Sequence, residues 1–446
     1  MATTSSRSEL KRARYDVKDL DTVLGLGIAL TCLAAVLTCV HVPQQPAKKA
    51  APSTRNSTSR IDASAPTPSV TAATTPAALA LARPPHKSLD GFREALKQIQ
   101  VKRLEQPLRV LWLGDSHTAG VTWPSTVEQI LIKQAPSGGP GFLPLGLPNQ
   151  RQHGAKISSD PGFDIAPHPP AKRSPEDDGV FGLAGFRATS HDRALEVVVK
   201  IDAKAGQGDL DCQLMYRYQR PNDRLVVSFS GKQFEVPEDS PVTFPHGLRI
   251  FRFKLPTQAL LQVRILHGSP ELFGMIAETS NPGIVIDVLG INGARFATPL
   301  AWDEESWKAL VSFRHPALAV VAYGTNEVFD EVNPDRYESD IVRLLARLRA
   351  AVADVECLLA GPTDVGRGGR SAQDRVRAID EMERRVAEHQ GCAYFSPYQT
   401  MGGDSSFEEW LHATPALATP DRIHLTPAGY GRLGEQMGEL LVNGLP

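Results

Sequence analysis

The chain has 446 residues, of which 41% are hydrophobic, enough to bury a sizeable core in more than one domain. Lys and Arg together number 48 and Asp and Glu 50, so the formal net charge is −2. Because this balance provides no strongly basic surface, we expect no nucleic-acid partner.

Residues 23–42, VLGLGIALTCLAAVLTCVHV, contain no Asp, Glu, Lys or Arg, and about 20 apolar residues can cross a bilayer as a helix. Five basic residues precede this run and none follows before Lys48. The positive-inside rule therefore predicts a cytoplasmic N-terminus at 1–22 and export of everything after the run. A cleaved signal peptide is the alternative, although the run is long for one and no clear cleavage site follows it. A lipoprotein signal is disfavoured because threonine precedes both cysteines of the run.

Residues 43–86 are dominated by Pro, Ala, Ser and Thr, a composition typical of a disordered linker. The sequence thus predicts an inner-membrane anchor whose remaining domain lies in the periplasm or outside the cell. Outside the anchor, Cys212, Cys357 and Cys392 are an odd number and do not form a disulfide framework. No CxxC or clustered His/Cys spacing indicates a structural metal site.

The apolar run RVLWL at 109–113 stops at Gly114-Asp115-Ser116-His117. This pattern predicts a buried strand ending in small and polar residues, where an α/β sheet places its chemistry. A serine at such a position is more often a helix cap than a nucleophile. Catalysis by Ser116 would require a base, an orienting acid and an oxyanion hole from elsewhere in the chain.

From about 190 to 278 the sequence consists of short, partly alternating segments rich in β-branched and aromatic residues, with no helix-length pattern between them. They are LEVVVKI, LDCQLMYRYQ, RLVVSFSG, RIFRFKL and LLQVRIL. The pattern predicts an antiparallel β-module inserted at 190–278. This module could bind glycan through Tyr216, Tyr218 or Phe229, or it could serve structural packing, because strand aromatics usually belong to a core.

The rest of the chain alternates strands with helices. Apolar runs typical of buried strands occur at 284–289, 317–323, 355–360 and 392–395. Between the later runs, apolar residues recur with helical spacing at Ile341, Leu344, Leu345, Leu348 and Val352, and more loosely at Val376, Ile379, Met382 and Val386. Residues 87–189 and 279–446 are therefore predicted to form a parallel sheet with helices on both faces.

A candidate base and its acid partner stand near the C-terminus, in DRIHLTPAGY. Asp421 and His424 precede a helix start marked by Thr426 as N-cap and Pro427 at the first position. Three-residue spacing in a turn allows the carboxylate to reach the imidazole Nδ1–H. The Nε2 atom would then be free to accept a serine proton.

Two other predicted strands end in glycine and asparagine. LGINGARF contains Gly290, Asn292 and Gly293, and AYGTNEV contains Asn326. At the carboxyl ends of strands, a glycine N–H and an asparagine side-chain N–H could stabilise an oxyanion. Ordinary turn chemistry explains the same residues when each is taken alone.

In this order, the Gly-Asp-Ser, glycine, Gly-x-Asn and Asp-x-x-His blocks resemble the SGNH (GDSL) hydrolases over about residues 105–122 and 284–440. The resemblance implies a three-layer, flavodoxin-like α/β fold with Ser116 as nucleophile, His424 as base and Asp421 as its orienter. It also implies an oxyanion hole of the Ser116 and Gly293 N–H groups and the Asn326 side chain, with Gly290 competing for the role of Gly293. The blocks I-N-G and G-T-N-E depart from the commoner S-G and G-x-N-D.

Finer features resemble the exported branch of this superfamily that includes peptidoglycan O-acetylesterases: GDSHTAG, APSGGPGFLP, GINGARF and MGGDSSFEEW. Members of that branch can carry a β-rich, carbohydrate-binding-like module between the nucleophile and glycine blocks. The resemblance implies a serine esterase that removes O-acetyl groups from cell-wall or extracellular glycan, with peptidoglycan as the favoured substrate. It implies an acyl-serine intermediate and no metal or organic cofactor.

Two alternatives remain open. A polysaccharide O-acetyltransferase would use the same triad and pass the acyl group to a sugar hydroxyl instead of to water. A catalytically inactive wall-glycan-binding protein would keep the fold only as a scaffold. The expected partners are thus an O-acetylated glycan and the membrane, which residues 23–42 would span.

Overall fold

The computed structural model describes residues 89–444 except 102, 103, 105, 149, 153, 168–176 and 204–207. All described residues belong to one compact unit, Ala80–Pro446. The predicted cytoplasmic segment 1–22, anchor 23–42 and linker 43–86 lie outside the described residues. Within the described part, no helix has both the length and the apolar character needed to span a bilayer.

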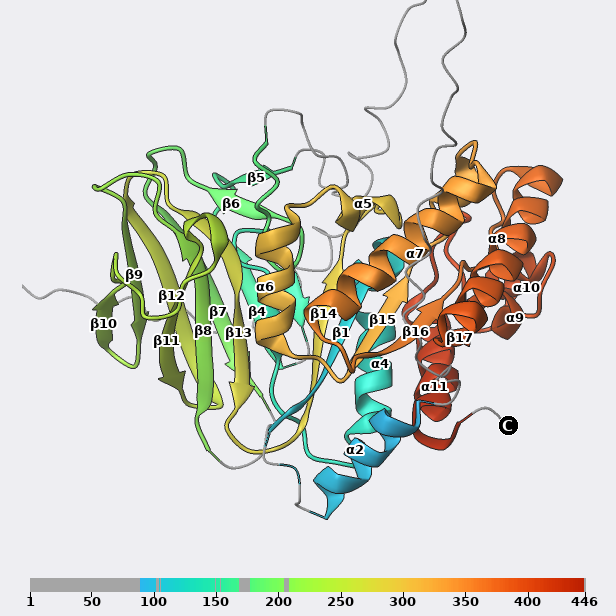
Figure 1. The fold of residues 1–446 in the computed structure, drawn as a ribbon, viewed down its shortest axis with the longest axis horizontal. Coiled ribbons are helices and arrows are strands. Elements are labelled where there is room, and N and C mark those ends of the chain that lie inside the picture. Colours follow the sequence, from blue (N-terminus) through green and yellow to red (C-terminus); the bar gives the residue numbers. More distant parts are fainter. Residues whose placement is uncertain are drawn as a thin grey trace, which may run out of the picture. The chain divides into compact units, whose positions relative to one another are not determined.

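A five-stranded parallel sheet forms the centre of this unit (Figure 1). If the five strands are numbered in chain order, their order across the sheet is 2-1-3-4-5, which is the flavodoxin-like arrangement. The five apolar runs predicted as its strands are confirmed. In spatial order the strands are β14 (Ile284–Gly290), β1 (Leu108–Gly114), β15 (Leu318–Ala322), β16 (Glu356–Ala360) and β17 (Ala393–Phe395).

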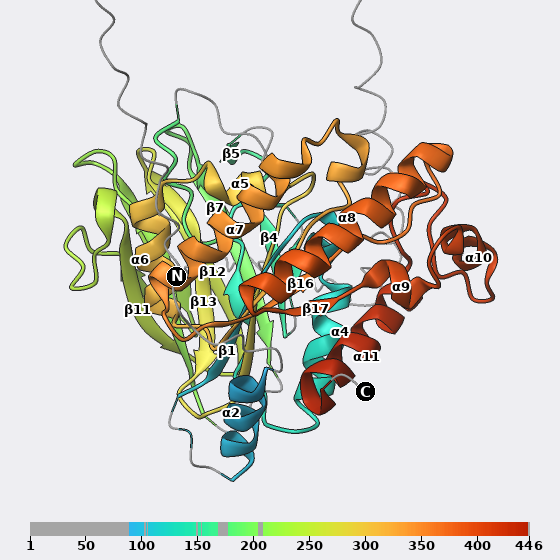
Figure 2. The ribbon, with the colours of Figure 1, turned by 45° about the vertical axis from the view of Figure 1, so that its right-hand side comes forward.

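Side chains of β1 alternate between two hydrophobic cores, one on each face of the sheet. Val110 and Trp112 belong to one core, and Leu111 and Leu113 to the other. Helices complete both cores, which confirms the predicted three-layer α/β fold (Figures 1 and 2). The first core is covered by α2 (Asp90–Gln100), α4 (Thr122–Leu131) and α11 (Pro427–Asn443), and the second by α6 (Glu304–Arg314), α7 (Pro334–Ala351) and α8 (Gly369–Gln390).

The apolar spacing that predicted two helices corresponds to the buried faces of α7 and α8. Asn333 begins α7 by accepting a hydrogen bond from the Arg336 N–H, and Pro334 occupies its first position. Gly391 ends α8 in the left-handed conformation, with φ 65°. The predicted residues Ile341, Leu344, Leu345, Leu348, Val352, Val376, Ile379 and Val386 are buried, and Met382 is partly buried.

Two antiparallel sheets lie beside the parallel sheet (Figure 1). The strands of the first, in spatial order, are β10 (Lys232–Glu235), β9 (Arg224–Phe229), β12 (Gln258–His267), β7 (Leu195–Asp202), β4 (Ala155–Ser159) and β3 (Gln150–Gln152). The second contains β11 (Arg249–Leu255), β8 (Leu210–Arg217), β13 (Glu271–Thr279), β6 (Arg187–Thr189) and β5 (Asp164–Ala166), with β2 (Gly141–Leu143) also paired to β13.

The antiparallel structure begins earlier than the predicted module 190–278. The strands β2 to β6 lie between residues 141 and 189, in the segment predicted to belong to the hydrolase domain. β4 pairs with β7, and β2 and β6 pair with β13. These early strands contain only three to five residues. Because such short strands give too few alternations for a periodic signal, the boundary predicted at residue 190 is too late.

The aromatic residues considered for glycan binding mostly pack inside the β-structure. Tyr216 is fully buried and its hydroxyl donates to the Pro237 carbonyl, at 2.5 Å. The Tyr218 hydroxyl donates to the Val236 carbonyl, at 2.8 Å. Both tyrosines therefore serve structural packing, which was the alternative to glycan binding.

One ion network joins the antiparallel strands to the parallel sheet. Arg314 of α6 is 2% exposed. Its guanidinium binds Asp287 of β14 at 2.8 Å and Glu278 of β13 at 3.0 Å. Arg109 of β1 binds Glu278 at 2.7 Å. Because hydrophobic residues of β8 and β13 also share a core with α6 and α7, the β-structure and the parallel sheet pack as one compact unit.

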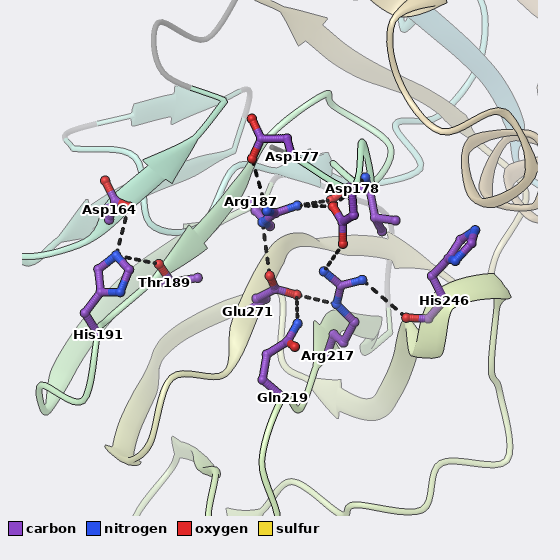
Figure 3. Close-up of polar contacts among 11 residues, drawn as sticks. Asp164, Asp177, Asp178, Arg187, Thr189, His191, Arg217, Gln219, His246 and Glu271 are labelled. Atoms are coloured by element: carbon purple, nitrogen blue, oxygen red, sulfur yellow. Dashed lines mark hydrogen bonds and ion pairs between the residues drawn. The ribbon is translucent and has the colours of Figure 1, made fainter. Parts of the chain in front are cut away.

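A second ion network fixes the segment after residue 176 to the antiparallel sheet (Figure 3). Arg187 binds Asp178 at 2.5 Å and Glu271 at 3.0 Å. Arg217 binds the same two carboxylates, with 2.8 Å to Asp178. Each arginine also lies over a phenylalanine ring. Because these arginines and carboxylates pair with one another, we assign the network a structural role.

Cys357 and Cys392 form a disulfide, and Cys212 is free and buried. The sequence argument from an odd cysteine count did not predict this pair. β16 and β17 run parallel with Leu358 opposite Ala393, so the preceding residues lie side by side. The disulfide pairing thus follows from the register of the two strands, and the number of cysteines gives no information about that register.

Candidate active site

Ser116 lies at the carboxyl end of β1, where the strand turns into the short helix α3 (Ser116–Ala119). Asp115 caps this helix by accepting a hydrogen bond from the His117 N–H, at 2.9 Å. Glycine is required nearby, because a Cβ on Gly290 would lie 2.2 Å from the Ala119 nitrogen. Gly290 therefore allows α3 to approach the end of β14 closely, which explains the residue by packing.

The structure brings the three predicted triad residues together. Ser116 Oγ lies 2.8 Å from His424 Nε2, and His424 Nδ1 lies 2.7 Å from Asp421 Oδ2. The predicted helix start is also confirmed: Thr426 caps α11 by accepting from the Gly429 N–H, with Pro427 in the first turn. Asp421 and His424 therefore lie in the loop directly before α11.

Asp421 is held in its ionised form. Partial burial opposes ionisation, but hydrogen bonds from His424, Thr419 and the backbone outweigh it and lower the pKa of Asp421 well below its ordinary value. Its Oδ1 accepts from the Thr419 hydroxyl at 2.6 Å and from the Ile423 and His424 N–H groups at 3.0 and 2.9 Å. Because a carboxylate only accepts, His424 must carry its proton on Nδ1, and Nε2 accepts from Ser116.

Gly293 and Asn326 lie in loops that follow β14 and β15. Gly293 has φ 78°, in the left-handed region. Within the described part of the chain, no group accepts from its N–H or from that of Ser116. Gly290 instead sits in strand register opposite Gly114. Of the two glycines considered, Gly293 therefore lies in the loop beyond the strand, whereas Gly290 ends the strand.

The Asn326 side chain contacts two acceptors. Its Nδ2 donates to the Ala294 carbonyl at 3.0 Å and to Asp115 Oδ2 at 3.3 Å. Burial raises the pKa of Asp115 to about 7, although a backbone hydrogen bond from His117 and the nearby His424 oppose this shift. A titratable carboxyl therefore lies directly beside the candidate oxyanion donor.

The sequence argument assigned no role to His117 or Tyr430, which border the triad. The His117 ring centre is 5.3 Å from that of His424, and His117 Nδ1 is 3.0 Å from the Tyr430 hydroxyl. Burial, together with the nearby His424, lowers the pKa of His117 to about 3, so this second imidazole stays neutral. The sequence signal that could have indicated a role for His117 was its position directly after Ser116.

Two further side chains fix the loops around the site. Arg295 donates to the Gly293 carbonyl at 2.8 Å and forms a two-bond ion pair with Asp330, at 2.5 and 2.8 Å. Glu327 accepts from the Phe296 N–H at 3.0 Å and from the Gly324 N–H at 3.2 Å. Burial raises the pKa of Glu327 to about 7 despite these bonds. Together they tie the glycine block to the Asn326 loop.

The part of the chain that the structure describes contains no group of three His, Cys, Asp or Glu side chains arranged to hold a metal ion. A cavity of about 980 Å³ lies elsewhere, at the beginning of β1. It is lined by Leu108 and Arg109 together with residues of β8, β11 and β13, and none of the candidate catalytic residues contributes to it.

The profile of the GDSL-like Lipase/Acylhydrolase family matches residues 266–432. This region contains Gly293, Asn326, Asp421 and His424. Residues 266–432 are therefore similar to a GDSL-type hydrolase domain. Ser116 lies outside the matched region, and most of the antiparallel strands stand between it and the later blocks in the chain. No curated protein matches the sequence.

Among solved structures, the chain is similar to "Peptidoglycan O-acetylesterase in action, 5 min", with a TM-score of 0.65 and 21% identity over 79% of this chain and 95% of that one. Coverage of this size exceeds what the α/β layers alone could supply, so the shared fold includes antiparallel strands. The chain also matches a lipase/acylhydrolase from Enterococcus faecalis, with a TM-score of 0.29 and 16% identity over 36% of this chain and 76% of that one. It matches the acetyl xylan esterase AlAXEase with a TM-score of 0.28 and 17% identity over 36% of this chain and 81% of that one.

Proposed function

We propose that this protein is a serine esterase that removes O-acetyl groups from cell-wall or extracellular glycan, with peptidoglycan as its substrate. The observation that carries the proposal is the chain of hydrogen bonds from Asp421 through His424 to Ser116, at 2.7 and 2.8 Å. The GDSL-type domain and the fold shared with a peptidoglycan O-acetylesterase support an esterase.

In the proposed reaction, His424 Nε2 takes the Ser116 proton while Oγ attacks the acetyl carbonyl carbon. The ionised Asp421 stabilises the imidazolium that forms. Collapse of the tetrahedral intermediate breaks the ester bond, and the proton on His424 passes to the departing sugar oxygen. The product of this half-reaction is an acetyl-serine.

The developing oxyanion would accept from the Ser116 and Gly293 N–H groups and from Asn326 Nδ2. The 3.3 Å bond from Asn326 to Asp115 is the longer of its two and is the one that the oxyanion would replace. In the second half-reaction, His424 deprotonates a water molecule that attacks the acetyl-serine. Acetate leaves and the Ser116 proton is restored.

The test measures acetate release from O-acetylated peptidoglycan, acetylated xylan and acetylated alginate in parallel, with Ser116→Ala as the control. Peptidoglycan de-acetylated by mild base provides the substrate blank. We expect release from O-acetylated peptidoglycan by the parent enzyme only. Transfer of acetyl to an added glycan in excess of free acetate would indicate the acetyltransferase instead. Binding without turnover would indicate an inactive wall-binding protein.

We also propose that residues 23–42 anchor the enzyme in the inner membrane, with the hydrolase domain in the periplasm or outside the cell. The Cys357–Cys392 disulfide supports this location, because disulfides persist in oxidising compartments. Protease added to intact spheroplasts should degrade the domain while a cytoplasmic marker survives. Protection of the domain in spheroplasts but not in lysate would contradict export.

A further inference from the structure

A segment after β16 lies between the two catalytic loops. The Gly366 N–H donates to the Arg422 carbonyl at 3.1 Å, and the Arg422 guanidinium donates to the Gly366 carbonyl at 3.2 Å. Arg422 directly follows Asp421. This double contact fixes one end of the segment beside the triad loop.

The other end of the segment contacts the loop that carries Asn326. That loop continues into a 3-10 helix, η3 (Glu327–Phe329), and the Phe329 N–H donates to the Asn326 carbonyl at 3.2 Å. Arg375 of α8 donates to the Val328 carbonyl. A Cβ placed on Gly368 would lie 3.8 Å from Phe329 Cε1. The segment 366–370 therefore lies between the triad loop and η3.

Phe329 exposes its ring at this position. It is 39% exposed, and it belongs to the few large hydrophobic side chains of the described residues that are so accessible. Gly368 and Gly369 both have left-handed backbones, with φ 88° and 62°. A Cβ on Gly369 would meet nothing within 4 Å, so there is open space beside the segment. An exposed aromatic face with open space beside it can stack on the apolar face of a sugar ring.

Two arginines belong to this segment: Arg367 directly precedes Gly368, and Arg370 lies in the first turn of α8. Arg367 and Arg370 are exposed, and neither has a hydrogen-bond or ion-pair partner among the residues that the structure describes. Two acids of the adjoining loops are already paired with other arginines, since Asp330 binds Arg295 and Glu408 binds Arg422. Arg367 and Arg370 therefore carry positive charge that no described carboxylate pairs, in the segment that contacts the triad loop.

We propose that Phe329, Arg367 and Arg370 form a substrate subsite that selects an acetylated glycan bearing a carboxylate. Phe329 stacks on the sugar ring beside the acetyl ester, and the guanidinium groups bind a carboxylate of the same or the adjoining unit. Guanidinium groups match carboxylates in shape and charge. The inference rests on the proposed esterase function and specifies its substrate class as an acidic glycan.

The test compares two substrates that differ only in charge: O-acetylated peptidoglycan fragments, and the same fragments with their carboxylates converted to amides. The parent enzyme should show a kcat/KM about tenfold higher on the acidic form, as expected for charge-assisted hydrogen bonds. The double variant Arg367→Ala/Arg370→Ala should lose this preference. Arg385→Ala is the matched control, because Arg385 is exposed on the same helix and forms no ion pair with any residue that the structure describes. It should keep the preference.

Phe329→Ala should lower kcat/KM on both fragment forms alike, relative to a small chromogenic acetyl ester, because stacking does not depend on charge. Phe329→Tyr should restore it. Phe234→Ala, an exposed phenylalanine on β10, provides the control for a general surface effect. An equal kcat/KM of the parent on acidic and amidated fragments, or a charge preference that survives in the double arginine variant, would overturn the subsite. Cleavage of the small ester but of neither fragment would overturn the proposed function itself.

Discussion

Ser116 Oγ and His424 Nε2 lie 2.8 Å apart although 308 residues separate them in the chain. Two helices set this distance. α4 begins shortly after Ser116, and α11 begins just after His424. Two glycines of α11 allow the helices to pack closely. A Cβ on Gly434 would lie 2.5 Å from the Thr126 Cβ of α4, and a Cβ on Gly438 would lie 2.8 Å from the Ile130 Cβ.

Replacing Ser116 or His424 by alanine should each reduce kcat/KM for a small acetyl ester by several orders of magnitude. The nucleophile and the base act as a unit, so the double variant should be little worse than either single one. Steady-state kinetics on the three purified variants checks this, with thermal melting to confirm that each is folded. Near-parental activity of Ser116→Ala would remove the serine from the mechanism.

Substitution at the α4–α11 contact should affect both stability and activity. We expect Gly434→Ala and Gly438→Ala each to cost on the order of 1–3 kcal/mol, because the added methyl overpacks the interface. The displaced α11 should also lower kcat. Gly431→Ala is the matched control: it lies on the same helix with nothing within 4 Å of its Cβ. It should stabilise by roughly 0.5–1 kcal/mol through helix propensity. Equal effects at all three glycines would argue against this packing role.

Asn326→Ala should lower kcat by about 10²-fold and leave KM almost unchanged. The reason is that its donor would serve the oxyanion of the transition state more than the bound ester. Kinetics on a soluble acetyl ester, at several substrate concentrations, separates the two parameters. A raised KM with unchanged kcat would instead place Asn326 in substrate binding.

Asp115→Asn should alter how stability depends on pH. The ordinary pKa of this carboxyl is 3.8, and in the folded protein it is about 7. Between these values the folded state holds more protons than the unfolded state, so this group makes stability fall as pH rises. From pH 5 to pH 8, Asp115→Asn should gain on the order of 2 kcal/mol relative to the parent.

Urea unfolding of both proteins at the two pH values measures this difference. The exposed Asp354→Asn provides the control and should follow the parent at both pH values. A stability difference between Asp115→Asn and the parent that is the same at pH 5 and pH 8 would show that Asp115 does not titrate in this range.

Arg314→Met should destabilise the protein strongly, by about 3–5 kcal/mol, because it leaves Asp287 and Glu278 buried without this cation. The control Arg336→Met replaces a side chain that is 82% exposed and should change stability by less than about 0.5 kcal/mol. Chemical denaturation of both variants tests the comparison. Because Arg314 pairs with both Glu278 of β13 and Asp287 of β14, the loss measures the whole ion network that joins these two strands to α6.

The sequence by itself determined the five strands of the parallel sheet, the two long helices with their apolar faces, and the cap that begins α11. These features depend on local chemistry: a run of apolar residues, a 3.6-residue period, or a threonine followed by proline. The motif residues Ser116, Asn326, Asp421 and His424 could also be selected from sequence, because their blocks, in this order, resemble those of the SGNH hydrolases.

Only the tertiary structure decided the rest. The strands β2 to β6 are too short for a periodic pattern. They depend on long-range partners: β4 pairs with β7, β2 and β6 pair with β13, and β3 and β5 pair in turn with β4 and β6. The disulfide depends on the register between β16 and β17. The contacts of Asn326 with Asp115, and of Gly366 with Arg422, join residues far apart in the chain. Such pairings depend on long-range packing and strand register, which no local window of sequence contains.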